Sequence, residues 1–176
     1  MSLGEFSISA SACVKALTRN QVDHVVTVPD WVQLSLHDRL NKGVKGIRVI
    51  NACNENQVVT VAAGLTIGGK RPLVMMQNQG LYNCFNTLRA VCLDAHIPMV
   101  FLVGQFGREF SNIGHPTSES ARTMVRIAEP FLQSIGVPFH ILDTEEDLLK
   151  LDQAYEQAQV QRTAVVLLVG APMAWR

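Results

Sequence analysis

The dominant pattern in this sequence is an alternation of short, continuously apolar runs with longer stretches of helical character. Six runs rich in Val, Ile and Leu lie at residues 24–28, 46–51, 72–76, 98–103, 137–142 and 163–169. Runs of this length, without polar alternation, are typical of strands buried on both faces of a parallel sheet. The order therefore predicts an α/β fold: a three-layer open sheet of six mostly parallel strands with helices on both faces.

Local signals predict where some helices begin and break. Asp30 precedes Gln33 by three residues, which predicts an N-cap with a capping-box-like partner. Pro130 is expected to kink or split the helix within residues 117–134. The stretch 105–117 is long for a link between a strand and a helix, so it is either a functional loop or a plain surface excursion.

Composition narrows the class of protein. Hydrophobic residues make up 48% of the 176 residues, which is enough to bury a core. Lys and Arg number 15 and Asp and Glu number 15, so the net charge is zero and no basic excess points to a nucleic-acid partner. No apolar run reaches the roughly 18 residues of a membrane span. We expect neither a nucleic-acid nor a membrane partner.

The start of the chain and the cysteines bear on domain limits and location. Residues 1–5 lack a basic region followed by an apolar one, so they do not resemble a signal peptide. We expect residues 1–6 to be a cloning remnant or a disordered start, and residues 7–176 to form a single domain. The four cysteines are scattered without the spacing of a metal site. Reduced thiols in a cytoplasmic protein are the resulting expectation.

Candidate chemistry lies after the predicted strands, because ligands of open α/β sheets bind beyond the carboxyl ends of the strands. Glu55 follows the second run and opens an apolar helix. The helix dipole favours its charged form and burial favours its neutral form, so such a carboxylate could exchange a proton with a ligand. By spacing alone, an ordinary acidic residue in a first turn is the more common case. We expect Glu55 and residues 77–80 to lie at the same edge of the sheet.

Common phosphate and nucleophile motifs are missing. The sequence has no G-x-x-x-x-G-K-[ST] loop and no G-x-S-x-G elbow. Four other segments in order, 28–38, 54–64, 69–72 and 77–83, resemble the pyrimidine-binding domain of thiamine-diphosphate enzymes. The resemblance covers about residues 7–172. It is strongest to the alpha subunit or N-terminal half of the sulfopyruvate and phosphonopyruvate decarboxylases. Gln79 stands where that family usually has Ser, and Tyr82 where it usually has Gly.

The resemblance implies roles for particular residues. Glu55 would hydrogen-bond the aminopyrimidine ring of the cofactor and promote its activation, and Asp30 would face the reacting carbon. His115 and Arg108 would relay protons or bind an anionic substrate group, unless they are solvated loop residues, and Tyr82 would lie near the substrate. The residues implied in seating the cofactor are Pro29, Glu55, Gln77, Asn78, Gln79, Gly80 and Leu81. No metal ligand is expected in this chain.

The implied function is that of half an active site. Family members bind Mg²⁺ and the diphosphate through a G-D-G…N motif, which this sequence lacks. The resemblance therefore implies the pyrimidine-binding subunit of a heteromeric thiamine-diphosphate-dependent 2-oxoacid decarboxylase. Its partners would be a complementary diphosphate-binding chain, a like chain in a dimer or higher oligomer, and a small 2-oxoacid. The alternatives are another carboligase or lyase subunit, acetolactate-synthase-like, or a non-catalytic regulatory homologue. Glu55 speaks against the last, because a non-catalytic domain does not need it.

Overall fold

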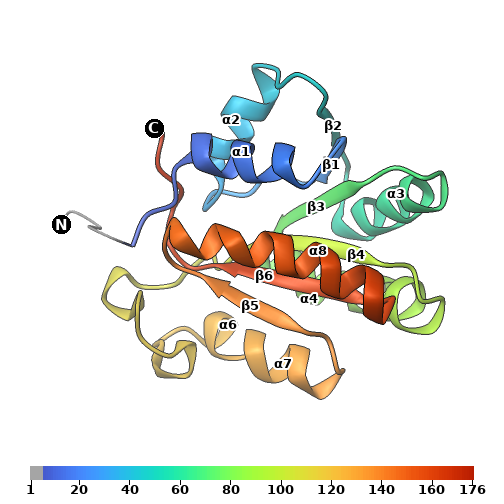
Figure 1. Cartoon of the computed structure of the whole chain (residues 1–176). Coiled ribbons are helices and arrows are strands. Elements are labelled where there is room, and N and C mark those ends of the chain that lie inside the picture. The colour runs from blue at the N-terminus through green and yellow to red at the C-terminus, as the bar shows by residue number, and fades with distance from the viewer. Residues whose placement is uncertain (1–5) are drawn as a thin grey trace.

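The computed structural model describes residues 6–176 and contains one six-stranded sheet in the order β2-β1-β3-β4-β6-β5 (Figure 1). All five pairs of neighbouring strands are parallel, which confirms the predicted fold class. The strands are β1 (His24–Thr27), β2 (Arg48–Asn51), β3 (Pro72–Gln77), β4 (Met99–Gly104), β5 (Phe139–Leu142) and β6 (Ala164–Val169). The expectation for residues 1–6 falls outside the described residues except at Phe6.

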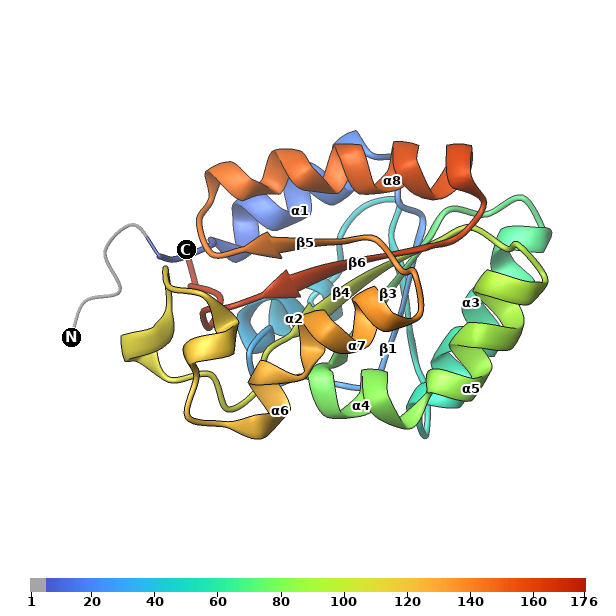
Figure 2. The same cartoon turned by 90° about the horizontal axis from the view of Figure 1, so that it is seen from below.

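Helices cover both faces of the sheet, with α1, α2 and α8 on one side and α3, α4, α5, η1 and α7 on the other (Figure 2). The α-helices are α1 (Ala10–Arg19), α2 (Leu34–Asn41), α3 (Glu55–Ile67), α4 (Asn78–Asn83), α5 (Phe85–Leu88), α6 (Thr123–Arg126), α7 (Ala128–Ser134) and α8 (Leu149–Gln161). The shorter turns are the π-helix η1 (Arg89–Asp94) and the 3₁₀-helices η2 (Phe110–Asn112), η3 (Thr117–Glu119) and η4 (Glu146–Leu148). No helix within residues 6–176 is long and apolar enough to cross a membrane.

The central strands divide their side chains between two cores. In β4, Val100 and Leu102 face the core under α1, α2 and α8, whereas Phe101 and Val103 face the core under α3 and α7. Successive strand residues point to opposite faces, so a strand covered on both sides must be apolar throughout. This is the physical origin of the continuous apolar runs in the sequence.

The expectation that all six strands are buried on both faces is wrong for two of them. All residues of β4 and β6 are buried, but the outer residues Arg48 and Asn51 of β2 are exposed, and only Leu142 of β5 is buried. These are the two edge strands of the sheet, which have a neighbour on one side only. Position in the sheet, rather than local sequence, decides this difference.

Two expected helix features have different outcomes. The N-cap predicted at Asp30 is wrong, because α2 begins at Leu34 with Gln33 as its N-cap residue. The carboxylate of Asp30 instead accepts a hydrogen bond from the Val32 N–H within the preceding turn. The expected split near Pro130 is confirmed: α6 ends at Arg126, and α7 starts at Ala128 with the proline in its first turn.

The strand order creates a crevice where ligands of this fold class bind. The chain runs outward from β1 to β2 and then returns to place β3 on the other side of β1. The helices that follow β1 and β3 therefore leave on opposite faces of the sheet, α2 on one and α4 on the other. Such a topological switch point opens a crevice beyond the carboxyl ends of the two strands. Pro29 and Asp30 follow β1 there, and Asn78 follows β3.

Candidate active site at the carboxyl edge of the sheet

Glu55 is the first residue of α3 and lies partly exposed beside this crevice. Asn54 caps the helix, its side-chain oxygen accepting the Gln57 N–H at 3.0 Å. The Glu55 side chain lies against Gly80 of α4, where an added Cβ would come within 2.6 Å of Oε1. The Asn83 amide approaches the other carboxylate oxygen at 3.5 Å. The expectation that Glu55 and residues 77–80 share one edge of the sheet is therefore confirmed.

The segment expected to seat a cofactor divides into outward and inward side chains. The Gln77 amide donates to Oε1 of Gln79 at 3.1 Å, and the Gln79 side chain is exposed. The Asn78 amide is completely buried and donates to the carbonyls of Phe106 and Met124 at 3.1 and 3.3 Å. Leu81 is fully buried in the core. Gln77 and Gln79 can meet a ligand through their side chains, whereas Asn78 holds the loop after β4.

Tyr82 points away from the crevice. Its hydroxyl donates to the Met124 carbonyl at 2.6 Å, and its ring meets Phe131 edge-on with the centroids 5.5 Å apart. Burial raises the pKa of Tyr82 to about 12, so the phenol stays protonated and keeps donating at neutral pH. The bulk of Tyr82 thus lies between α4 and the α6–α7 segment.

Asp30 is buried and directed into the protein, with 1% of its surface exposed. Its two carboxylate oxygens accept hydrogen bonds from the Val32 N–H at 2.8 Å and from the Gln33 amide at 2.7 Å. The carboxylate packs on Gly104 of β4, where an added Cβ would lie 2.8 Å from Cγ of Asp30. Burial raises the pKa of Asp30 to about 6, and the hydrogen bonds only partly oppose that effect. The neighbouring Pro29 is exposed.

Two residues that the sequence interpretation missed as site residues, Gln33 and His37, hold Asp30 in place. The Asp30 N–H donates to Nε2 of His37 at 3.1 Å, and burial lowers the pKa of His37 to about 4, so the ring stays neutral. The Gln33 amide is fully buried and also donates to the Leu102 carbonyl at 3.2 Å, while its own oxygen has no partner. The sequence could have identified them by their spacing: they lie three and seven residues after Asp30, which indicates one face of a helical segment.

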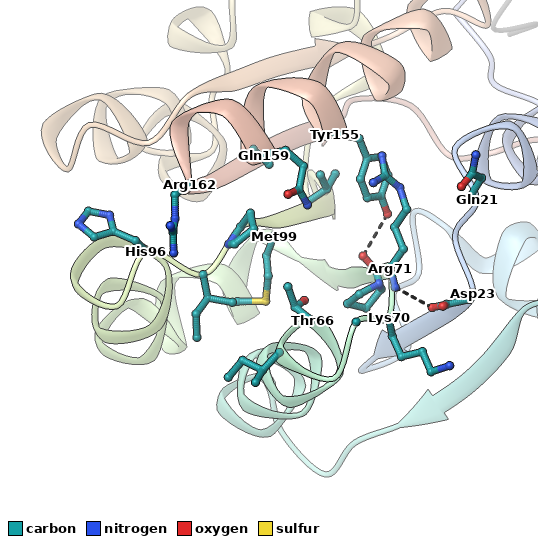
Figure 3. A pocket seen from close by; sticks show the side chains of 17 residues that line it. Gln21, Asp23, Thr66, Lys70, Arg71, His96, Met99, Tyr155, Gln159 and Arg162 are labelled. Atoms are coloured by element: carbon teal, nitrogen blue, oxygen red, sulfur yellow. Dashed lines mark hydrogen bonds between the residues drawn. The ribbon is translucent and has the colours of Figure 1, made fainter.

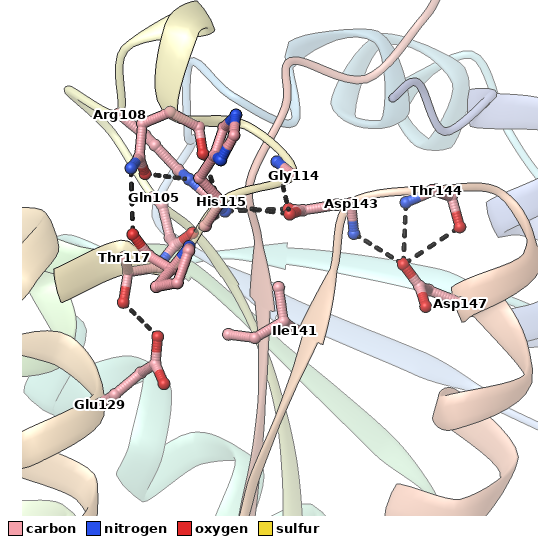
Figure 4. Close-up of polar contacts among 12 residues, drawn as sticks. Gln105, Arg108, Gly114, His115, Thr117, Glu129, Ile141, Asp143, Thr144 and Asp147 are labelled. Carbon is pink, nitrogen blue, oxygen red and sulfur yellow. Dashed lines mark hydrogen bonds and ion pairs between the residues drawn. The ribbon is translucent and has the colours of Figure 1, made fainter. Parts of the chain in front are cut away.

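Arg108 is the centre of a buried polar cluster (Figure 4). Its side chain is 1% exposed and pairs with Asp143 after β5 at 2.9 and 3.2 Å. The remaining guanidinium N–H groups donate to side-chain oxygens of Gln105 and Asn112 and to the carbonyls of Asn112 and His115. Every donor is used inside the protein, so none is left for a substrate anion.

The loop that carries His115 is folded by this cluster. The His115 carbonyl accepts from Arg108 and its N–H donates to the Asn112 carbonyl, while the residue itself is exposed. Glu109 in the same loop accepts from the Ser120 hydroxyl and the Ala121 N–H, each at 2.6 Å. The hydrogen bond from Ser120 is the main cause that lowers the pKa of Glu109. His115 is the titratable side chain of this loop that remains directed to solvent.

Within residues 6–176, no group of three or more His, Cys, Asp and Glu side chains is arranged to hold a metal ion. Asp30 and Asp143, which follow strands, are both engaged by neighbouring side chains. The acidic residue beside the crevice with a partly exposed side chain is Glu55.

Three known relatives are similar to this chain in length and match it over most of both chains. The chain is 22% identical over 167 residues to the sulfopyruvate decarboxylase subunit alpha of Methanococcus maripaludis, covering 95% of this chain and 96% of that protein. The corresponding subunit of Methanothermobacter thermautotrophicus is 29% identical over 126 residues, covering 70% and 76% of the two chains. That of Methanocaldococcus jannaschii is 26% identical over 140 residues, covering 80% and 79%.

A solved structure supports the fold independently. The Rhodococcus jostii RHA1 thiamine diphosphate-dependent 4-hydroxybenzoylformate decarboxylase matches 96% of this chain with a TM-score of 0.72 and 20% identity. The chain spans 32% of the length of that enzyme, so it corresponds to one part of a larger protein. The model of the thiamine pyrophosphate enzyme N-terminal TPP-binding domain matches residues 9–124, more than half of the chain and including Glu55 and Gly80. The chain therefore belongs to the family of thiamine pyrophosphate enzymes, as a member of its N-terminal TPP-binding domains.

Proposed function

We propose that this chain is the pyrimidine-binding subunit of a thiamine-diphosphate-dependent decarboxylase that acts on a small 2-oxoacid. The observation that carries the proposal is the placement of Glu55, a partly exposed carboxylate at the start of α3, against Gly80 at the β1/β3 switch point. Relatives named as sulfopyruvate decarboxylase alpha subunits support the reaction class.

The residues at the crevice fit an aminopyrimidine ring. Such a ring offers a nitrogen that can carry a proton and an amino group that donates hydrogen bonds. Glu55 supplies a carboxylate acceptor, and the partly exposed amide of Gln77 and the exposed amide of Gln79 supply further donors and acceptors. Gly80 leaves room for the Glu55 side chain, because a Cβ at that position would overlap it. Pro29, which is exposed, follows β1 at the same edge of the sheet.

Thiamine diphosphate, when bound, supplies the carbanion chemistry that 2-oxoacid decarboxylation requires. The role of this chain is to orient the pyrimidine and to hold or move a proton at its ring nitrogen through Glu55. Asp30 is proposed to act as a positioning residue, because its inward carboxylate fixes the turn 30–33 by accepting hydrogen bonds from the Val32 N–H and the Gln33 amide. His115 is proposed to face the substrate, since the residue is exposed on the loop after β4.

The site is proposed to be completed by a complementary chain. Mg²⁺ is bound by oxygen ligands such as carboxylates, and within residues 6–176 no group of three or more His, Cys, Asp and Glu side chains is arranged to hold a metal ion. The name "subunit alpha" of the relatives supports a partner of another kind. Alone, the chain should bind thiamine diphosphate weakly in calorimetry, and the added partner should create Mg²⁺-dependent binding and decarboxylation. Tight, Mg²⁺-dependent binding of thiamine diphosphate to this chain alone would contradict the proposal that the chain carries only half of the site.

Self-association and cellular location belong to the same proposal. Gly64 on α3 is exposed with nothing within 4 Å of its missing side chain, and Ile67 is 74% exposed. This surface allows the close approach of a second copy, so we expect at least a dimer. Light scattering at micromolar concentration tests this, and a monomer would contradict it.

Four free cysteines support a cytoplasmic location.

The decisive test is Glu55→Gln in the reconstituted complex. Glutamine keeps the shape and hydrogen bonding of the side chain but cannot exchange a proton as a carboxylate does. A positioned acid–base group typically contributes about 10²–10⁴-fold to rate, so kcat should fall by that factor with an unchanged Tm. Glu146→Gln is the matched control, because Glu146 is also an exposed carboxylate in a helical first turn. Activity of both variants close to wild type would refute the role of Glu55.

A further inference from the structure

A large cavity lies at the amino-terminal edge of the sheet, opposite Glu55. It has a volume of about 930 Å³ and is formed by the starts of β3 and β4 and the ends of α3, η1 and α8 (Figure 3). Its lining mixes polar side chains with a few apolar ones, among them Pro98, Met99 and Ala158. Because it shares no residue with the carboxyl-edge crevice, it is a separate site whose existence does not depend on the proposed function.

Positive charge dominates the lining of this cavity. Lys70, Arg71, His96 and Arg162 line it, and the acidic residue among the lining side chains is Asp23. Asp23 is already engaged, since Oδ1 accepts the Arg71 N–H at 3.0 Å and lies 2.8 Å from Nδ1 of His24. Within residues 6–176, the side chains of Lys70 and Arg162 form no hydrogen bond or ion pair with another residue. The two cations are thus available for an anion.

Arg71 is held in a fixed orientation at the edge of the cavity. Its guanidinium lies over the ring of Tyr155, 4.5 Å from the centroid, and its Nε donates to the Asn20 carbonyl at 2.6 Å. Tyr155 is fixed in turn by its hydroxyl, which donates to the Pro72 carbonyl at 3.1 Å. A guanidinium oriented in this way loses little side-chain entropy when its terminal N–H groups bind an oxyanion.

Three residues around the cavity adopt a costly backbone conformation. Gln21, His96 and Arg162 are the non-glycine residues with positive φ in the described chain, at 58°, 55° and 52°, and all three line this cavity. Each lies just beyond a helix, where glycine is the usual residue because other residues are strained in this conformation. The presence of a side chain at these positions, in place of glycine, is explained if the side chain itself contacts a ligand.

We infer that this cavity binds a small oxyanion with two or more negative charges, of the phosphoryl or diphosphoryl class, between Lys70, Arg71 and Arg162. Lys70 and Arg71 lie at the end of α3 and the start of β3, and Arg162 lies across the cavity at the end of α8 (Figure 3).

The test uses inorganic pyrophosphate as the probe and the full chain at low ionic strength. Amide shifts in an NMR titration should cluster at residues 69–72, 96–99 and 159–163, and calorimetry should give a dissociation constant below about 1 mM. The variant Lys70→Gln/Arg162→Gly should weaken binding at least about tenfold, because two charge-assisted contacts are lost. Lys15→Gln/Arg39→Gln removes the same charge from exposed positions on α1 and α2 and should change the affinity less than about twofold.

A stability measurement separates ligand binding from a purely structural role. Cations at helix C-termini also offset the helix dipole, and that role alone predicts a lower Tm when Arg162 is removed. Arg162→Gly relieves the left-handed backbone, so our inference predicts a Tm raised by about 2–4 °C together with weaker pyrophosphate binding. A lower Tm with unchanged binding would overturn the inference. Equal loss of affinity in the control variant, or no shifts at the amino edge up to millimolar pyrophosphate, would overturn it as well.

Discussion

Arg108 is predicted to stabilise the fold rather than to bind substrate, and Arg108→Met tests this. The substitution leaves the Asp143 side chain, 13% exposed, without its cation and removes donors from four further oxygen atoms. Removing one partner of a buried ion pair typically costs about 3–5 kcal/mol. For a chain of this size, 1 kcal/mol shifts Tm by about 2–4 °C. We therefore expect Tm to fall by about 6–20 °C.

Thermal unfolding followed by circular dichroism measures this, and a double-mutant cycle identifies the cause. Asp143→Leu alone should also be strongly destabilising, because it leaves the Arg108 guanidinium buried without a counter-ion. The double variant Arg108→Met/Asp143→Leu should be more stable than the sum of the two single losses by about 1–3 kcal/mol, since neither charge remains unpaired. Additive losses would show that the two side chains do not interact as the structure describes.

The two roles of Arg108 differ in their kinetic signature. A substrate-binding arginine would raise KM on substitution and leave Tm nearly unchanged. The structure predicts instead that the main effect is a large loss of Tm rather than a rise in KM. A variant Arg108→Met with wild-type Tm and a strongly raised KM would refute the structural role.

Three further predictions rest on individual contacts. Burial raises the pKa of Asp30 from its ordinary value of 3.8 to about 6, so its contribution to stability is present below about 3.8 and is lost as pH rises through about 6. Urea unfolding should therefore show the stability of Asp30→Asn rising with pH relative to wild type between about pH 4 and 6; a constant difference would contradict the burial. Burial lowers the pKa of His37 from 6.5 to about 4, so its contribution is present above about 6.5 and is lost as pH falls through about 4. His37→Gln should accordingly lose stability relative to wild type as pH rises over the same range, and parallel curves would count against it. Gly80→Ala should lower activity about 10²-fold by displacing the Glu55 carboxylate. Wild-type activity of Gly80→Ala would show that Gly80 does not place Glu55.

Much of the architecture could be predicted from local sequence. Continuous apolar runs indicate strands covered on both sides, and the helical segments between them require parallel pairing. Because parallel strands end at one edge, the sequence order alone places Glu55 and residues 77–80 together, as the structure confirms. The sequence did not predict that β2 and β5 are edge strands, because a run of five or six residues does not indicate whether its strand pairs with one neighbouring strand or with two.

The sequence by itself determined the fold class, the edge that carries the candidate site and the position of Glu55, because periodicity and strand order are local properties of the chain. Only the tertiary structure decided which polar side chains turn inward. Asn78 bonds to Met124, and Arg108 to Asp143, partners 46 and 35 residues away along the chain. A polar side chain is directed inward when distant groups satisfy its hydrogen bonds, since an unsatisfied buried group is costly. The sequence near such a residue does not contain those partners, so the fold must form before its role is defined.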